Sequence, residues 1–210
     1  MKYGTRKSRM SLNEIYFWTD TIKDWRKLLE EDPFKEIIIE CWRKLVKRKK
    51  IAIYGFVIMP NHLHIIWEML EKNGKEMPHA GFNKFTSHQF LENLRLKSVE
   101  VIDQYKEEDS PVRKHRFWQR DPLAVMMSSR RMMEQKLEYI HFNPLQEKWS
   151  LACRPEDYKW SSAKFYEEGE DEFNIVTHLY GSVLGLVSGS VCEDTDQGQR
   201  QEIDFRNEKK

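Results

Sequence analysis

Two short β-type runs separated by one turn constrain the fold of this chain more than any other feature. Residues 51–59 and 62–69 are rich in β-branched, aromatic and other apolar residues, and only Pro60-Asn61 separates them. A Pro-Asn pair suits the central positions of a tight turn. The pattern therefore predicts a β-hairpin, which places two antiparallel strands side by side.

Further elements are expected on both sides of this hairpin. Residues 14–19 (EIYFWT) are aromatic and β-prone, which predicts an earlier strand. Asp32-Pro33 supplies an N-cap and a first-turn proline for a helix whose apolar residues recur at helical spacing up to Val46. The same spacing over residues 82–105 predicts a second helix.

The remaining elements complete the order of the fold. β-prone pieces occupy residues 115–119 and 124–127, and Ser128 or Ser129 caps a helix that runs to about His141. The order β-α-β-β-α-β-α is typical of an α+β fold with a ferredoxin-like antiparallel sheet and helices packed on it. Residues 155–166 are expected to add a short helix or a packed turn.

Chain length and charge distribution indicate one domain with an appendage. We expect a domain over residues 11–166 and a C-terminal extension over residues 167–210, whose polar, acidic end is expected to be disordered. Residues 1–150 carry 28 basic against 21 acidic side chains, and residues 151–210 carry 7 against 13. A basic body is compatible with a polyanionic partner, although solvated helix faces carry such charges too.

The sequence also bears on the compartment. The basic start leads into no apolar signal segment, and no apolar run approaches roughly 18 residues, so we expect a cytoplasmic protein without membrane spans. Cys41, Cys153 and Cys192 are too few and too scattered for a disulfide framework or a zinc site. They are expected to be inert thiols.

Two histidines in the second run of the hairpin are the first candidates for chemistry. His62 and His64 lie two residues apart on a predicted strand, so both imidazoles project from the same face. A hydrogen-bonded core histidine or a surface histidine is the ordinary explanation of such a spacing alone. Here the pair lies within FVIMPNHLHIIW, where burying two imidazoles costs free energy unless something binds them. The context favours a divalent metal site.

The last helix offers a third ligand and a nucleophile. Tyr139 and Asn143 are four residues apart and share a helical face, so an amide oxygen and a phenol would lie one turn apart. Taken alone, the two residues also fit a packed tyrosine and a helix C-cap before Pro144. His141 is a rival third ligand, but its offset of two from Tyr139 places it on another face of the helix.

Five segments carry a resemblance to a known family. They are YGFVIMPNHLHIIWEM (residues 54–69), NKFTS (83–87), FWQRDP (117–122), LEYIHFNPLQEKW (137–149) and PEDYKWSSAKFY (155–166). In this order they resemble the IS200-like transposases, and within these most of all the REP-associated tyrosine transposases, single-tyrosine members of the HUH nuclease superfamily. The resemblance spans roughly residues 13–166.

The resemblance implies a function and assigns roles by position. His62 and His64 match the paired histidines of the HUH motif, Tyr139 matches the nucleophilic tyrosine, and Asn143 matches the polar residue that completes the metal site. The insertion-sequence branch commonly has glutamine at the last position, so asparagine fits the REP-associated branch better. The family further implies Mg²⁺ or Mn²⁺, single-stranded hairpin DNA as partner, association with the nucleoid during action, and either a monomer or a homodimer.

The expected reaction is nicking and joining of single-stranded DNA. A metal held by two imidazoles and an amide would withdraw charge from the scissile phosphate, and Tyr139 would attack it to form a 5′-phosphotyrosine. The motif G-x-x-x-x-G-K-[ST] is absent, which argues against a fused ATPase. Two alternatives remain open: a catalytically silent hairpin-binding protein, and a small metal hydrolase that uses bound water.

Contacts with DNA are the least specified part of the expectation. Phosphate contacts and one stacking ring are expected in the segment 113–120, and two more contacts in the segment 83–87. The residues are Arg113, Lys114, Arg116, Trp118 and Arg120, together with Lys84 and Thr86. The alternative for the first segment is a solvated edge strand with Trp118 in the core.

Overall fold

A computed structural model describes residues 10–97, 99–107, 114–179 and 181 of the chain. The described residues up to Leu179 belong to one compact unit, and Gly181 is the one described residue beyond it. The core of this unit includes Phe173, Ile175 and Leu179. It therefore continues beyond the boundary at Tyr166 expected from the sequence. The disorder expected at the acidic end lies outside the described residues.

The sheet is antiparallel, as the sequence predicts. Strands β1 (Ile15–Thr21), β2 (Ile51–Ile58), β3 (His62–Met69) and β4 (Leu123–Met126) form one sheet in the order β2-β3-β1-β4. All three strand pairs are antiparallel. The predicted hairpin joins β2 to β3, and the Met59 amide donates to the carbonyl of His62 across its turn, at 2.8 Å.

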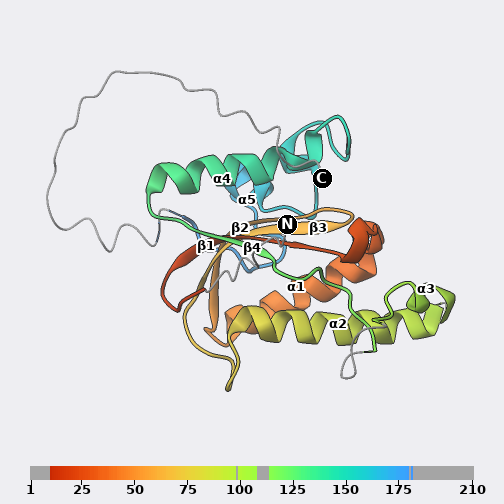
Figure 1. The fold of residues 1–210 in the computed structure, drawn as a ribbon. Coiled ribbons are helices and arrows are strands. Elements are labelled where there is room, and N and C mark those ends of the chain that lie inside the picture. Colours follow the sequence, from red (N-terminus) through yellow and green to blue (C-terminus); the bar gives the residue numbers. More distant parts are fainter. Residues whose placement is uncertain (1–9, 98, 108–113, 180, 182–210) are drawn as a thin grey trace, which may run out of the picture. The chain divides into compact units, whose positions relative to one another are not determined.

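The two faces of the sheet are covered by different helices (Figure 1). Helices α1 (Asp32–Lys47) and α2 (Pro78–Lys97) lie on one face, and α4 (Arg130–Phe142) lies on the other. Side chains of β1 alternate accordingly: Trp18 contacts Phe82 of α2, whereas Phe17 contacts Tyr139 of α4. The α4 face is the one that carries the histidine pair.

Helix α4 packs closely on the sheet because β2 has no side chain at Gly55. A Cβ at this position would lie 2.4 Å from the Leu137 Cδ1 atom and 3.2 Å from the Ile140 Cδ1 atom of α4. The pairing of β2 with β3 also shifts register between Ile53 and Gly55. The absence of a side chain at Gly55 therefore leaves room for these two side chains of α4 against β2.

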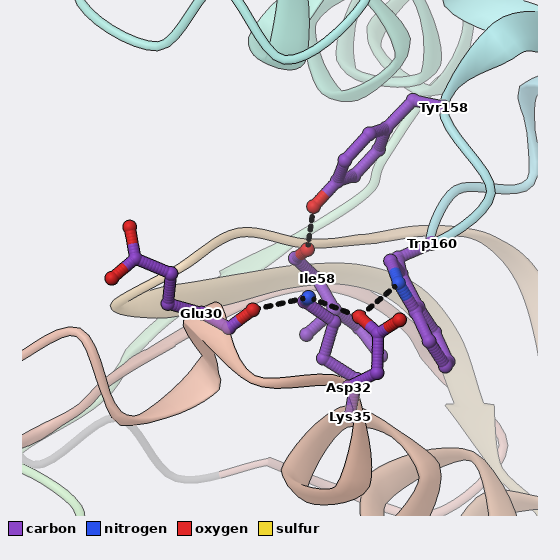
Figure 2. A network of polar contacts seen from close by, with 6 residues as sticks. All are labelled: Glu30, Asp32, Lys35, Ile58, Tyr158 and Trp160. Atoms are coloured by element: carbon purple, nitrogen blue, oxygen red, sulfur yellow. Dashed lines mark hydrogen bonds and ion pairs between the residues drawn. The ribbon is translucent and has the colours of Figure 1, made fainter.

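The segment after α4 is tied to the first half of the fold by polar contacts (Figure 2). The Trp160 indole donates to Asp32 Oδ1 at 3.0 Å, and the Tyr158 hydroxyl donates to the Ile58 carbonyl at 2.8 Å. Lys35, nearly buried, donates to the same carboxylate and to the Glu30 carbonyl. A 3₁₀ helix (Pro155–Asp157) and helix α5 (Ala163–Glu168) form there, where a short helix or packed turn is expected over residues 155–166, and α5 continues two residues beyond that segment.

Three local expectations need correction. The N-cap of α1 is Glu31 and not Asp32, because the Asp32 carboxylate is bound to Lys35 and Trp160. The helix expected over residues 82–105 is two helices, α2 and α3 (Val99–Asp103). Residues 115–119 form isolated bridges instead of a regular strand, since their partners lie in two separate segments, at Lys106 and at Ile22.

Cysteines and membrane spans can be assessed for the described residues. Cys41 is buried, and burial raises the pKa of its thiol to about 12, which agrees with an inert thiol. Cys153 is an exposed free thiol, and Cys192 lies outside the described residues. None of the helices that the structure describes is long and apolar enough to cross a membrane.

Candidate functional site

The two histidines lie together on the α4 face of the sheet. His62 begins β3 and His64 follows two residues later; their ring centroids are 4.7 Å apart and both side chains are buried. The pairing of β1 with β3 places Thr19 opposite His64 and Thr21 opposite His62. Two adjacent imidazoles are thus held by the central strands of the sheet, which are its most constrained part.

A neighbouring side chain binds one ring nitrogen of each histidine. The Asn61 amide nitrogen donates to the Trp25 carbonyl at 3.3 Å, so the Asn61 oxygen accepts from His62 Nδ1, at 2.6 Å. Thr19 Oγ1 lies 2.7 Å from His64 Nδ1. With Nδ1 protonated and hydrogen-bonded, a neutral imidazole presents the lone pair of Nε2, as metal-binding histidines do.

The environment keeps both rings neutral. Burial lowers the pKa of His62 to about 4, with a smaller contribution from nearby Lys148. Burial lowers the pKa of His64 well below its usual value, and His62, Lys136 and Lys148 contribute in the same direction. Neutral imidazoles are the form in which histidine binds metals.

Tyr139 lies against this pair from α4. Its ring centroid is 5.4 Å from that of His64 and 6.2 Å from that of Phe17, both edge-on. Asn143 is the C-cap of α4 and begins a 3₁₀ helix with Pro144, and its side chain is buried. The four residues singled out in the sequence are therefore placed on β3 and on the helix that covers it.

Among the described residues, a nitrogen of the histidine pair and the Asn143 amide oxygen are buried polar atoms without a partner. Neither His64 Nε2 nor Asn143 Oδ1 has a hydrogen-bond partner among the residues that the structure describes. A buried acceptor without a partner is unfavourable by about 1 to 3 kcal/mol, and a cation relieves this cost. The donor set therefore fits a divalent cation.

The donor set is also unusual for a metal site. In the described part of the chain, no cluster of three or more His, Cys, Asp or Glu side chains could hold a metal. A cation at the histidine pair would therefore take its third protein ligand from an amide. Two neutral imidazoles and an amide oxygen carry no negative charge. An anion from outside the protein would therefore balance most of the charge of the cation.

His141, the rival third ligand, points away from the pair. Its Nε2 atom lies 2.8 Å from the Ser162 hydroxyl, and its ring contacts Tyr166. Burial lowers the pKa of His141 to about 4. It joins α4 to the segment before α5, and this excludes it as a partner of His62 and His64, as its position relative to Tyr139 predicts.

Two lysines bring positive charge to the site. The Lys136 ammonium, one turn before Tyr139, lies 4.7 Å from the Phe17 ring centroid and 5.3 Å from that of Tyr139. Lys148 is exposed and lies 5.8 Å from the Trp149 ring centroid. Neither forms an ion pair with any carboxylate among the described residues. The site can therefore attract an anion such as a phosphate.

The residues expected to contact DNA separate into two groups. Thr86 and Trp118 are buried, and the Trp118 indole donates to the Thr86 hydroxyl at 2.9 Å, so both are part of the core. Lys84, Arg116 and Arg120 line a cavity of about 820 Å³ together with Trp118. Lys114 is exposed, and Arg113 lies outside the described residues. Contact of the charged residues with DNA stays a prediction.

Several residues near the histidines were not expected from the sequence. They are Thr19 and Asn61, which bind the two Nδ1 atoms, and Phe17, Lys136 and Trp149, which surround the rings. Asn61 carries a signal in the sequence, because it directly precedes His62. Thr19 and Phe17 carry none, because their proximity depends on the register of β1 against β3.

Comparisons with known proteins relate the fold to one solved structure in particular. No protein-family model matches the chain, and no curated protein matches it in sequence. A structure of a REP-associated tyrosine transposase bound to a REP hairpin is similar over 97% of this chain and 100% of that chain, with a TM-score of 0.53 and 16% identity. The similarity shows a shared fold: a four-stranded antiparallel sheet with helices packed on it.

Proposed function

We propose that this protein is a metal-dependent single-strand DNA endonuclease and strand transferase, a transposase-like enzyme with Tyr139 as its nucleophile. The observation that carries the proposal is the convergence of β3 and α4: the Tyr139 ring lies 5.4 Å from the ring of His64, whose Nε2 atom is buried without a partner. The fold shared with a transposase whose structure contains a REP hairpin supports DNA as the partner.

His62 Nε2, His64 Nε2 and Asn143 Oδ1 would hold the cation, Mg²⁺ or Mn²⁺. Bound there, it would withdraw charge from the phosphate to be cleaved. Thr19 and Asn61 keep the Nδ1 atoms engaged, so the Nε2 lone pairs remain available. The ammonium of Lys136, close to the Tyr139 ring, attracts and orients a phosphate of the strand.

Tyr139 carries out the covalent step. Its phenolic oxygen loses its proton and forms a bond to the phosphorus, and the bond from phosphorus to the 3′-oxygen breaks. The departing 3′-oxygen takes up a proton and becomes a 3′-hydroxyl. The product is a 5′-phosphotyrosine, which remains a phosphodiester. A 3′-hydroxyl from another strand can attack it, release the tyrosine and join the strands without ATP.

A labelled library of single-stranded hairpin oligonucleotides tests the proposal. We expect a covalent protein–DNA adduct with Mn²⁺ and none with EDTA, resolved on a denaturing gel and mapped by peptide mass to Tyr139. Tyr139→Phe should abolish the adduct. Tyr105→Phe, which removes a phenolic hydroxyl from a side chain stacked on Phe117, should leave it intact. Hairpin binding by the wild type without any adduct would instead indicate a catalytically silent DNA-binding protein.

A further inference from the structure

Trp25 is an exposed tryptophan at the histidine pair. The structure describes all seven tryptophans of the chain; Trp25 is 61% exposed, and the others are buried or partly buried. Its ring centroid lies 6.4 Å from that of His62, which is the first residue of β3. Leaving a large aromatic surface in water is unfavourable, so its position beside the site calls for an explanation.

The backbone holds this side chain outward in an unfavourable conformation. Asp24 and Trp25 have φ angles of 57° and 56°, in the left-handed region that residues other than glycine seldom adopt. Hydrogen bonds impose this conformation: the Trp25 amide donates to the Ile22 carbonyl, and the Ile22 amide donates to the Asn61 carbonyl. Strain kept in this way is typical of binding and catalytic sites.

One side chain couples Trp25 to the histidine pair. The Asn61 amide nitrogen donates to the Trp25 carbonyl, and the Asn61 oxygen accepts from His62. The indole and the imidazole are therefore positioned by the same residue. A ligand that binds one of them lies next to the other.

We propose that Trp25 is a stacking platform for an unpaired nucleobase next to the phosphate at the histidine site. This inference rests on the proposed function, because it assigns the base to the same DNA strand. An exposed indole offers a flat π-surface that any base can stack on, and the ammonium groups of Lys136 and Lys148, which pair with no carboxylate of the described residues, offer charge for the adjoining phosphates. Aromatic and cationic groups arranged together are the usual means of binding single strands.

The test measures binding and needs no cleavage. Fluorescence anisotropy in EDTA gives the affinity of the full chain for a fluorescein-labelled oligothymidine about twelve nucleotides long. We expect Trp25→Ala and Trp25→Leu to weaken binding roughly 5- to 150-fold, the equivalent of the about 1 to 3 kcal/mol of one base–aromatic stack. Trp25→Phe keeps a π-surface and should stay within a few-fold of the wild type. Leu96→Ala, an exposed apolar side chain on α2, is the matched control and should have no effect.

The outcomes separate stacking from other roles. Weaker binding by the alanine and leucine variants, but not by the phenylalanine variant, supports the platform. Unchanged binding by all three variants overturns it. Equal loss by all three, phenylalanine included, indicates a role of the loop conformation and also overturns it. Thermal unfolding confirms that the variants fold.

The same design distinguishes this inference from the proposed function. If the wild type forms no adduct on Tyr139 but Trp25→Ala still weakens oligothymidine binding, the proposed reaction is wrong and the stacking site holds. If the adduct forms and an oligonucleotide is selected, single abasic substitutions along it locate the base. One position should weaken binding to the wild type but not to Trp25→Ala, and no such position would refute the platform.

Discussion

Individual side chains next to the histidines determine which nitrogen each imidazole can offer to a cation. Thr19 and Asn61 are not ligands in the proposed site, yet each holds the orientation of one ring through its Nδ1 atom. Residues of this kind are typically worth a factor of about 10 to 100 in metal affinity. Asp20 is also a buried polar side chain, and it lies on the opposite face of β1 from the histidines.

Thr19→Val removes the hydroxyl that holds His64 Nδ1 while keeping the shape of the side chain. We expect the affinity for Mn²⁺ to fall by about 10- to 100-fold, because the ring loses its orienting partner. Titration calorimetry with Mn²⁺ measures this directly. Thr177→Val, in a segment paired with β2 away from the histidines, should leave the affinity unchanged. Equal affinities of Thr19→Val and the wild type would show that Thr19 does not position a ligand.

Asp20→Asn should remove a pH dependence of folding stability. Asp20 is fully buried and accepts from the Asn83 amide and the Thr21 backbone, and burial raises its pKa to about 8. Between pH 4 and 8, roughly, the folded protein keeps a proton that the unfolded chain has released. The stability contributed by Asp20 is therefore complete below about pH 4 and is lost as the pH rises towards 8.

Urea unfolding of both proteins between about pH 5 and 8 measures this effect. Asparagine has no proton to lose in this range. The free energy of unfolding of the variant should therefore rise relative to that of the wild type by up to about 1.4 kcal/mol for each pH unit. Histidines titrate equally in the two proteins and cancel in the difference. Parallel stability curves would mean that Asp20 is ionised in the folded state.

Among the elements, α4 is the one whose position decides whether the site exists. It carries Tyr139 and ends at Asn143, and it reaches the sheet over Gly55. His141 of the same helix binds Ser162, whose hydroxyl also accepts from the Phe56 amide. Contacts at two neighbouring residues of β2, Gly55 and Phe56, thus hold the helix and the segment after it against the sheet.

Gly55→Ala tests the first of these contacts. The added methyl group would lie 2.4 Å from Leu137 Cδ1, so we expect a loss of about 1 to 3 kcal/mol in stability and slower adduct formation as α4 moves. Leu137→Ala in the same chain opens the space and should restore part of both losses. Gly81→Ala in α2, where the added methyl group would lie 3.4 Å from the Asn73 side chain, serves as the control. Additive losses in the double variant would show that the two side chains do not meet.

Helices and strands that are marked by apolar spacing, caps or turn residues could be predicted from the sequence. Contacts between elements that are far apart in the chain could not. The hairpin, α1 and α4 follow from apolar spacing and turn residues, and Ser129 is the N-cap of α4, with its side chain accepting from the Met132 amide. His62, His64, Tyr139 and Asn143 were singled out from their spacing and from the family resemblance. Thr19, Phe17 and Lys136 were missed, because their place near the histidines depends on strand register and helix packing. Trp118 was expected to stack on DNA because it lies among basic residues in the sequence, yet it is buried in the core.

At the scale of the whole molecule, the two candidate DNA surfaces lie on different faces of the sheet. The histidine pair is covered by α4, whereas the cavity of about 820 Å³ is lined by α2 residues such as Asn83 and Lys84 and by the segment with Arg116 and Arg120. Ala124 of the edge strand β4 also lines the cavity. A DNA molecule that contacts both surfaces must therefore pass an edge of the sheet, and β4 is the edge next to the cavity.

This separation predicts that the cavity contributes to DNA affinity and not to the cleavage rate. Lys84→Gln and Arg120→Gln should each weaken hairpin binding and reduce the slope of log affinity against log salt by about 0.7 to 0.9 for each phosphate that the variant no longer neutralises. The weakening should be modest, because Lys84 pairs with Glu76 and Arg120 with Glu107 in the free protein. The rate of adduct formation at saturating DNA should stay that of the wild type. Lys47→Gln, at the end of α1, removes the same charge elsewhere, and an equal effect of that variant would attribute the weaker binding to net charge and not to the cavity.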